Sequence, residues 1–267
     1  LEGIGFIPGR RMKDMSLARK HIQKINTYEA GRAIEEIKRQ LGLKKIIKLA
    51  SNENPLGPSP KAMEAVRKNL LFINRYPDSN GFYLKKKIPK YFNLEPSNIV
   101  LGNGSDELIE LIIKAFVEDG ENIVTSDFTF LEYKIISLAN DRTVITLPLK
   151  YFKYDLDAIK KRIDPKTKVI FIANPNNPTG TYVTKYEIEE FFKGLPEDLL
   201  VVLDEAYDAF IDVDDFPNSL SYLKKKNLLV LKTFSKTYGL AGLRIGFALG
   251  NPELISCLEK VRQPFNV

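Results

Sequence analysis

A lysine and an arginine eight residues apart stand out among the residues that could carry out chemistry. Lys236 and Arg244 lie in segment 232–244, which is rich in small residues and separates two apolar runs. An exposed lysine needs no such surroundings, although a flexible surface loop is the alternative interpretation. A lysine amine can form a Schiff base with a carbonyl compound, and an arginine can hold two phosphate oxygens at once. The pair therefore predicts a covalently held, phosphorylated ligand.

An acid and a group of asparagines follow two other apolar runs. Asp204 comes directly after run 199–203, and Tyr207 lies three residues further on. A carboxylate at the tip of an apolar strand is costly unless it meets a cation or hydrogen-bond donors. Segment 174–180, which includes Asn177, follows run 168–173. Plain turns would explain both segments in part, since Asp, Asn, Pro and Gly are common turn residues.

A glycine-rich turn follows a fourth apolar run. Residues 102–107 read Gly-Asn-Gly-Ser-Asp-Glu and lead into an amphipathic run. Glycines allow a tight turn, and the free N–H groups at a helix start can bind an anion. The alternative is that Ser105 or Asp106 simply caps the helix. Together the four run ends supply an anion site, an amide, a carboxylate and an amine, which is the set that pyridoxal 5′-phosphate requires.

The composition argues against several other kinds of site and partner. The chain has 267 residues with a single histidine, His21, and a single cysteine, Cys257, so we expect no His/Cys metal site and no internal disulfide. The net charge of +6 is mild, and the lysine runs 85–87 and 224–226 are short, which argues against a nucleic-acid partner. No apolar stretch is long enough to span a membrane. We expect a cytoplasmic protein.

The spacing of apolar residues predicts the elements that position these side chains. Short apolar runs alternate with amphipathic ones, which favours an α/β fold with a mainly parallel seven-stranded sheet sandwiched by helices. In such sheets ligands bind beyond the carboxyl ends of the strands. We expect strands over 99–101, 122–125, 143–147, 168–173, 199–203, 228–231 and 244–249. We expect helices over 29–41, 60–70, 81–91, 106–117, 130–140, 154–162, 185–192 and 252–261, and an extended Pro/Gly-rich segment over 51–60.

Six stretches of the sequence resemble the fold-type I, class I/II aminotransferases, and most closely the histidinol-phosphate aminotransferases. The stretches are SNENPLGPSP (51–60), NRYPD (74–78), GNGSDELI (102–109), NPNNPTG (174–180), LDEAY (203–207) and TFSKTYGLAGLRIG (233–246). Their order matches the family over nearly the whole chain. The resemblance implies a pyridoxal-phosphate-dependent transferase with an N-terminal arm and part of a small domain in residues 1–60. It places the large cofactor-binding domain in residues 61–267.

The resemblance also implies roles for the residues around the cofactor ring. Lys236 would hold the cofactor covalently, and Asp204 would keep the ring nitrogen protonated. Asn177 and Tyr207 would hydrogen-bond the ring hydroxyl, and Phe130 would stack on the ring. Lys236, Asp204 and Tyr207 would be the catalytic residues, and no metal is expected.

Further residues are implied at the phosphate and on the substrate side. Tyr76 would reach the cofactor phosphate of a neighbouring subunit, which implies a homodimer. Tyr28 resembles the arm tyrosine that lines the substrate side. The family continues beyond the last residue of this chain with a portion that carries the carboxylate-binding arginine, so we expect a C-terminally truncated chain with an incomplete small domain. The cofactor phosphate of the same subunit would be held by Gly104, Ser105, Asp106, Thr233 and Arg244.

The implied reaction is transamination between histidinol phosphate and 2-oxoglutarate in histidine biosynthesis. Other members of the family remain alternatives: an aromatic or general amino-acid aminotransferase, which also takes an amino acid and a 2-oxo acid, or a threonine-phosphate decarboxylase. A non-catalytic cofactor-binding module or an inert fragment is the alternative from a different class of protein.

Overall fold

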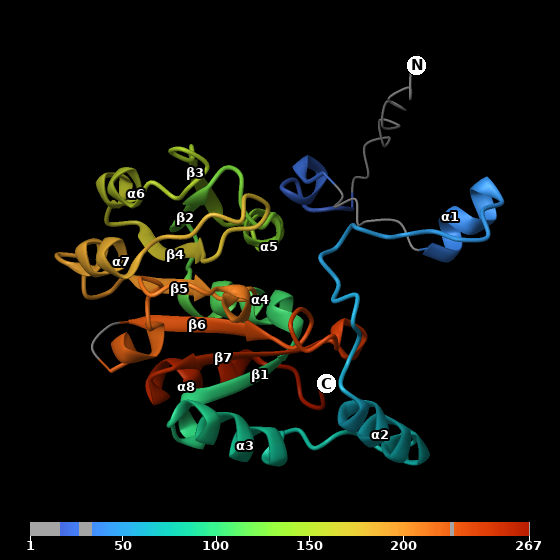
Figure 1. Cartoon of the computed structure of the whole chain (residues 1–267). Helices are drawn as coiled ribbons and strands as arrows, with labels where there is room; N and C mark the ends of the chain where they lie inside the picture. Colours follow the sequence, from blue (N-terminus) through green and yellow to red (C-terminus); the bar gives the residue numbers. More distant parts are fainter. Residues whose placement is uncertain (1–16, 27–33, 225–226, 267) are drawn as a thin grey trace.

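A seven-stranded sheet forms the centre of the computed structural model, which describes residues 17–26, 34–224 and 227–266. The strand order is β1-β7-β6-β5-β4-β2-β3, and β7 alone among these strands runs antiparallel, to both β6 and β1. The prediction of a mainly parallel seven-stranded sheet is confirmed (Figure 1). The strands are β1 (Ile99–Asn103), β2 (Asn122–Ser126), β3 (Thr143–Leu147), β4 (Thr167–Ala173), β5 (Leu200–Asp204), β6 (Leu228–Thr233) and β7 (Ile245–Gly250).

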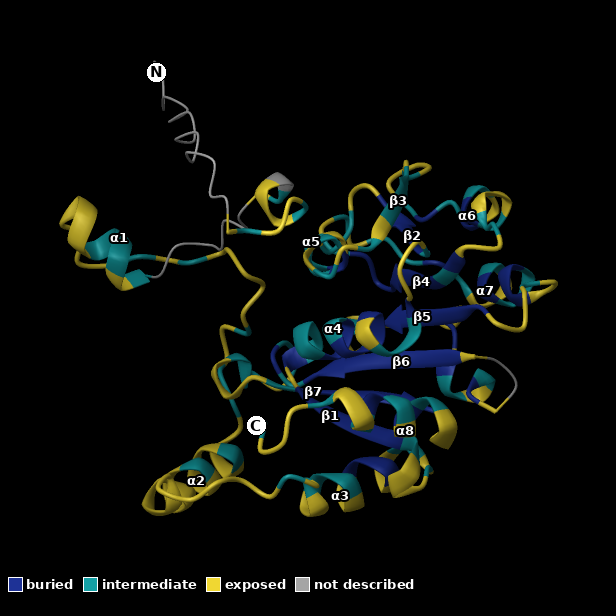
Figure 2. Cartoon of the chain, turned by 180° about the vertical axis from the view of Figure 1, so that it is seen from behind, coloured by how far each residue is buried: buried dark blue, intermediate teal, exposed yellow. Residues whose placement is uncertain are grey.

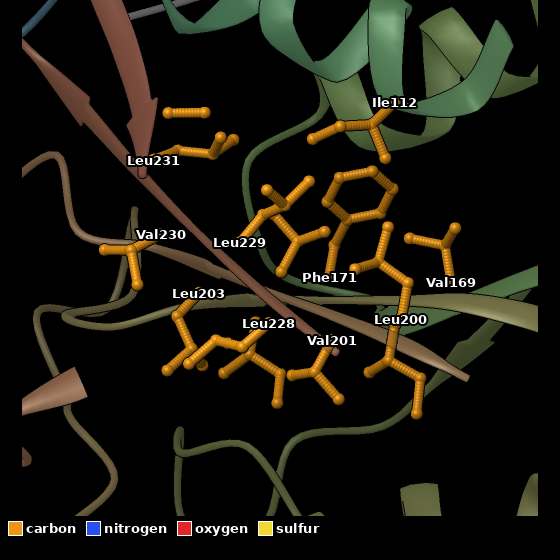
Figure 3. Packing of buried hydrophobic residues seen from close by; sticks show 14 of the residues in the cluster. Ile112, Val169, Phe171, Leu200, Val201, Leu203, Leu228, Leu229, Val230 and Leu231 are labelled. Atoms are coloured by element: carbon orange, nitrogen blue, oxygen red, sulfur yellow. The ribbon is translucent and has the colours of Figure 1, made fainter. Parts of the chain in front are cut away.

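The central strands are buried on both faces. All residues of β5 and β6 are buried, as expected for parallel strands between layers of helices. Figure 3 shows Phe171 and Leu231 on the face that Ile112 of helix α4 covers, and Val230 and Leu203 on the opposite face. This alternation follows from the two-residue repeat of a strand. The same alternation directs the side chains of Asp204 and its neighbour Glu205 to opposite faces.

The predicted helices are present with ends that shift by a few residues. Sequence signals set several helix starts: Ser59 caps α2 ahead of Pro60, Thr184 and Glu187 form a capping box, and Asn251 caps α8. The predicted helix over 29–41 is seen as α1, and residues 29–33 lie outside the described part. The helices are α1 (Ile34–Leu41), α2 (Pro60–Asn69), α3 (Phe82–Phe92), α4 (Gly104–Phe116), α5 (Glu132–Ala139), α6 (Leu156–Arg162), α7 (Lys185–Phe192) and α8 (Pro252–Val261).

The described residues before α2 lie beside the sheet rather than within its layers. Helix α1 contains no buried residue, and Figures 1 and 2 show it standing away from the sheet. Segment 51–59 then packs against the loop between β6 and β7, which contains Lys236. A Cβ on Gly239 would lie 2.5 Å from the carbonyl of Gly57, so the two segments touch through their backbones. The extended crossing segment is therefore as expected, while the domain division at residue 60 stays a prediction.

One edge of the sheet collects the chain segments that carry the candidate residues. The carboxyl ends of β1, β4, β5 and β6 lie there, and β7 begins there because it runs in the opposite direction. The register places Thr233 beside Gly246 and Gly102 beside the same glycine. Within the described residues, no helix is long and apolar enough to cross a membrane, and no group of His, Cys, Asp and Glu is suited to a metal ion.

Candidate active site

A cavity of about 640 Å³ opens at this edge of the sheet. It brings together residues from six separate parts of the chain, as expected for the carboxyl edge of an α/β sheet. Nine of the predicted site residues line it: Ser105, Asp106, Phe130, Asn177, Asp204, Tyr207, Thr233, Lys236 and Arg244.

Lys236 lies in the hairpin loop that joins β6 to β7. Its Nζ donates a hydrogen bond to the carbonyl oxygen of Ser51 at 2.9 Å and lies 5.5 Å from the centre of the Tyr207 ring. The backbone N–H of Gly239 bonds the carbonyl of Lys236, which holds the loop in a tight turn. The amine is thus presented to the cavity by a folded loop.

Asp204 is the last residue of β5 and is only 5% exposed. Burial raises the pKa of its carboxyl to about 6, against the opposing effects of hydrogen bonds from Tyr133 and from the Ala206 N–H and of the charge on Lys236. The Tyr133 hydroxyl donates to Oδ2 at 2.7 Å, and the Ala206 N–H donates to Oδ1 at 3.1 Å. A cationic group in the cavity would favour the ionised carboxylate.

Tyr133 is a site residue that sequence reasoning missed. Its ring is fully buried, stacks on Phe171 at 4.8 Å and meets the edge of Phe130 at 5.5 Å. The only sequence signal is an aromatic residue in a helical pattern, which indicates core packing rather than a hydrogen bond to a distant acid. Phe130 lies just before α5, and its carbonyl accepts a bond from the Tyr133 N–H at 3.3 Å, so both residues reach the cavity lining from the start of that helix.

The start of α4 and the residue before β7 meet at one corner of the cavity, where the sequence predicts an anion site. Arg244 Nη2 lies 2.9 Å from Asp106 Oδ2. Gly104 has φ +74°, and a Cβ there would lie 2.6 Å from the same guanidinium nitrogen. The corner therefore needs a glycine for both its backbone angle and its space.

Ser105 and Asp106 do not cap this helix. The cap position is Asn103, whose side chain makes no capping bond, and the helix begins at Gly104, two residues earlier than predicted. The first backbone N–H groups of the helix are therefore not capped by that side chain, and Ser105 and Asp106 of the first turn line the cavity. The alternative of a plain N-cap is wrong for both residues.

The neighbouring asparagines have different surroundings. Asn176 is buried and structural: it accepts a bond from Thr129 Oγ1 at 2.8 Å and donates to the carbonyl of Phe128 at 2.9 Å. Asn177 lines the cavity instead. Tyr207 also faces the cavity, and its hydroxyl accepts a bond from Asn52 Nδ2 at 3.0 Å.

The crossing segment contributes residues to which the sequence analysis gave no role. Ser51 and Asn52 line the cavity and have φ values of +71° and +50°. Non-glycine residues rarely adopt this conformation, and such strain is often found at functional sites. Thr233 and Ser235 line the same cavity, and the Ser235 N–H donates to Thr233 Oγ1 at 3.1 Å, which orients the threonine hydroxyl.

Among the described residues, two predicted site residues do not line the cavity: Gly104, which adjoins it at the Arg244 guanidinium, and Tyr76. Tyr76 is 82% exposed and stacks on Phe265 with 4.7 Å between ring centres. It does not line this chain's own cavity, and its predicted contact with a neighbouring subunit stays a prediction. Tyr28 lies outside the described residues.

Comparison with known proteins agrees with this geometry. Residues 44–267 match the family model described as aminotransferase class I and II. Histidinol-phosphate aminotransferase 1 of Mannheimia succiniciproducens is 48% identical over 96% of this chain and 70% of its own length. Histidinol-phosphate aminotransferase 2 of Hydrogenovibrio crunogenus is 47% identical over 92% of this chain and 66% of its own length.

A solved structure shows the same fold. The histidinol-phosphate aminotransferase of Sinorhizobium meliloti, in complex with pyridoxal 5′-phosphate, superposes with a TM-score of 0.85 at 30% identity, covering 94% of this chain and 67% of that one. The chain thus spans about two thirds of the length of the proteins it matches. From its sequence, fold and cavity, this chain belongs to the class I and II aminotransferases, whose cofactor is pyridoxal 5′-phosphate.

Proposed function

We propose that the protein transfers an amino group from histidinol phosphate to 2-oxoglutarate, with pyridoxal 5′-phosphate as cofactor. The observation that carries the reaction type is the meeting of Lys236, Asp204 and Arg244 in one cavity. The choice of histidinol phosphate rests on relatives that are 43–48% identical over most of the chain and carry that name.

The residues of the cavity fit the cofactor. Asp204 is a buried carboxylate without a buried cation of its own, as a protonated ring nitrogen requires. The α4 N-terminus, Gly104 and Arg244 form a cradle that a Cβ would fill, as a phosphate requires. Ser105, Asp106 and Thr233 complete that cradle in the proposal, and Phe130 covers the ring.

Lys236 has two tasks in this proposal. It would hold the cofactor covalently, and its amine, once free, would act as the base that takes the proton from the substrate α-carbon. When bound, the cofactor stabilises the negative charge that develops at that carbon. The Ser51 carbonyl lies where it can hold the free amine close to the cavity.

Asp204, Asn177 and Tyr207 orient the ring. The ionised Asp204 carboxylate favours the protonated ring nitrogen, and Tyr133 and the Ala206 N–H hold that carboxylate in place. Asn177 and Tyr207 are proposed to bond the ring hydroxyl. A fixed orientation matters because proton transfer needs the amine and the α-carbon in a defined geometry.

A second copy of the chain is part of the proposal. Tyr76 is exposed and does not reach the cavity of its own chain, which fits a role at the phosphate of a partner. Tyr28 is proposed on the substrate side. We also propose a cytoplasmic location, a small-domain part in residues 1–60 and a large domain in residues 61–267.

A substrate comparison tests the proposed function. The cofactor-loaded protein, in the length in which it is encoded, is assayed with histidinol phosphate, phenylalanine, aspartate and phosphothreonine, with 2-oxoglutarate as acceptor. We expect the highest kcat/KM with histidinol phosphate. A preference for another donor, or release of CO₂ from phosphothreonine, would refute the substrate assignment. Stable cofactor binding without turnover of any donor would indicate a non-catalytic binding module.

A further inference from the structure

A buried lysine lies close to the active site, on the face of the sheet opposite to the side chain of Asp204. Lys232 is only 8% exposed and lies in β6, four residues before Lys236. Its Nζ donates to Glu205 Oε2 at 2.8 Å and also bonds the carboxylate of Asp208. The strand predicted over 228–231 continues to Thr233, so Lys232 lies within β6 and not in the loop after it.

The register of the sheet shows why this lysine cannot reach the cofactor. Asp204 pairs with Leu231, and the Glu205 N–H bonds the carbonyl of Leu231 at 2.9 Å. Successive side chains of a strand point to opposite faces, so Lys232 lies on the side of Val230, away from Leu231. Figure 3 shows Leu231 and Val230 on these opposite faces. Within the described residues, Lys232 does not line the cavity that contains Asp204.

Lys232, Glu205 and Asp208 form a charged cluster, and burying charged groups costs free energy of desolvation. Burial raises the pKa of Glu205 despite its ion pair with Lys232. Burial also opposes the charge on Lys232, but the two carboxylates outweigh it and hold that pKa above its usual value. Apolar residues of similar size often stabilise a fold as well as a buried ion pair does. Fold stability alone therefore explains the cluster poorly.

Each of the three charged residues lies close in sequence to one residue of the site. Glu205 directly follows Asp204. Asp208 directly follows Tyr207 and begins the turn Asp208–Phe210. Lys232 lies at the end of the strand that leads into the Lys236 loop. One ammonium group thus links the backbone segments of three site residues that lie at the end of β5 or in the segments that follow β5 and β6.

We infer that Lys232 is a positioning residue that fixes Asp204, Tyr207 and Lys236 relative to one another through Glu205 and Asp208. It touches neither cofactor nor substrate and acts through the backbone of β5, β6 and the turn after β5. This inference deepens the proposed function and rests on it for the roles of the three site residues. The cofactor-binding geometry, rather than overall stability, is what the cluster is expected to control.

The main test uses the cofactor-loaded protein with Lys232→Met and the double variant Lys232→Met/Glu205→Gln. Three quantities are measured: Tm, kcat with KM, and the pH midpoint of the visible absorption of the lysine-linked cofactor. Lys232→Met is expected to lower Tm, to lower kcat by about tenfold or more with a smaller change in KM, and to shift the midpoint. The double variant also removes the buried charge of Glu205, and Asp208 is about one third exposed, so it should recover most of the Tm without recovering kcat or the midpoint. Recovery of all three would overturn the inference.

A control lysine with two acidic partners, though less buried than Lys232, lies near the start of β4, away from the site edge. Lys168 of β4 also meets two acids, Asp198 at 2.5 Å and Glu121 at 3.9 Å, but far along the strand from the site edge. Lys168→Met should leave kcat and the absorption midpoint at the wild-type values. An equal effect of Lys168→Met on the midpoint would show that any lost ion pair disturbs the site, and would overturn the inference.

A milder variant decides the matter if Lys232→Met does not fold. Asp208 is about one third exposed, so Asp208→Asn is expected to fold and to break only the link to the Tyr207 side. It should lower kcat and shift the midpoint in the same direction as Lys232→Met, with Tm nearly unchanged. Wild-type values for both would overturn the inference. The absorption midpoint needs no substrate, so the test of Lys232 remains valid even if histidinol phosphate proves to be the wrong donor.

Discussion

The bond between Tyr133 and Asp204 gives the sharpest prediction about the site. The substitution Tyr133→Phe keeps the buried ring and its stacking on Phe171 and removes only the hydroxyl that donates to Asp204 at 2.7 Å. Asp204 would keep a single hydrogen bond, from the Ala206 N–H. We expect the pKa of Asp204, which burial already raises to about 6, to rise further.

The size of the effect follows from the kind of bond. A hydrogen bond to an ionised group contributes about 1.5–3 kcal/mol. One pKa unit corresponds to about 1.4 kcal/mol, so the loss raises the pKa by about one to two units. In the cofactor-free protein this moves the carboxyl from mostly ionised at pH 7 to half protonated or more. A protonated Asp204 cannot favour a protonated ring nitrogen, so cofactor binding near neutral pH should weaken.

The assay is cofactor affinity as a function of pH, measured by titration of the apoprotein with pyridoxal 5′-phosphate. The acid limb of the affinity profile should move upward by about one to two pH units in Tyr133→Phe. Tyr154→Phe is the control, because Tyr154 is another buried tyrosine whose hydroxyl meets Thr129 at 2.5 Å and not Asp204. An acid limb that stays in place in Tyr133→Phe, or that moves equally in the control, would refute the reasoning.

Three further predictions concern residues of the same cavity. Lys236→Ala should abolish the borohydride-fixable attachment of the cofactor, seen by mass spectrometry, and retained attachment would exclude Lys236 as the anchor. Gly104→Ala should weaken cofactor binding about tenfold or more by displacing the Arg244 guanidinium, whereas Gly120→Ala, with a similar φ of +84° and free space around it, should leave affinity unchanged. In the cofactor-free protein, stability should fall as the pH rises from about 4 to about 6, because the raised pKa of Asp204 makes its ionisation unfavourable in the folded state. Asp204→Asn should remove that fall and be more stable at pH 7 by up to about 3 kcal/mol by urea unfolding, and an unchanged pH profile would contradict the assignment.

Most of the sheet could be predicted from the sequence, because each strand is a short local run of apolar residues. The direction of β7 could not. Segment 234–244 looks like any loop between two apolar runs, and only the pairing of Thr233 with Gly246 shows that it closes a hairpin. The candidate residues at the strand ends were found because polar side chains interrupt apolar runs there. That signal is local and needs no knowledge of the partner.

The residues that the sequence did not reveal depend instead on partners far away in the chain. Tyr133 and Lys232 matter through acids 71 and 27 residues away, and nothing near them in the sequence marks those partners. Ser51 and Asn52 lie in a segment whose prolines and glycines indicate only that it is irregular. Their contact with Lys236 and Tyr207 depends on how that segment crosses the sheet edge. Long-range contacts of this kind appear only in the folded chain.

The hairpin formed by β6 and β7 has a consequence for the order of folding. It carries Lys236 in its loop and Arg244 at the loop's end, so these two cations belong to one unit that is local in the chain. Closing a short loop costs less chain entropy than bringing distant strands together. The two cations can therefore reach their native spacing while β1, which comes much earlier in the chain, is still unpaired. In a refolding experiment, a phosphate-containing aldehyde should therefore react with Lys236 before Asp204 and the start of α4 have reached their native positions.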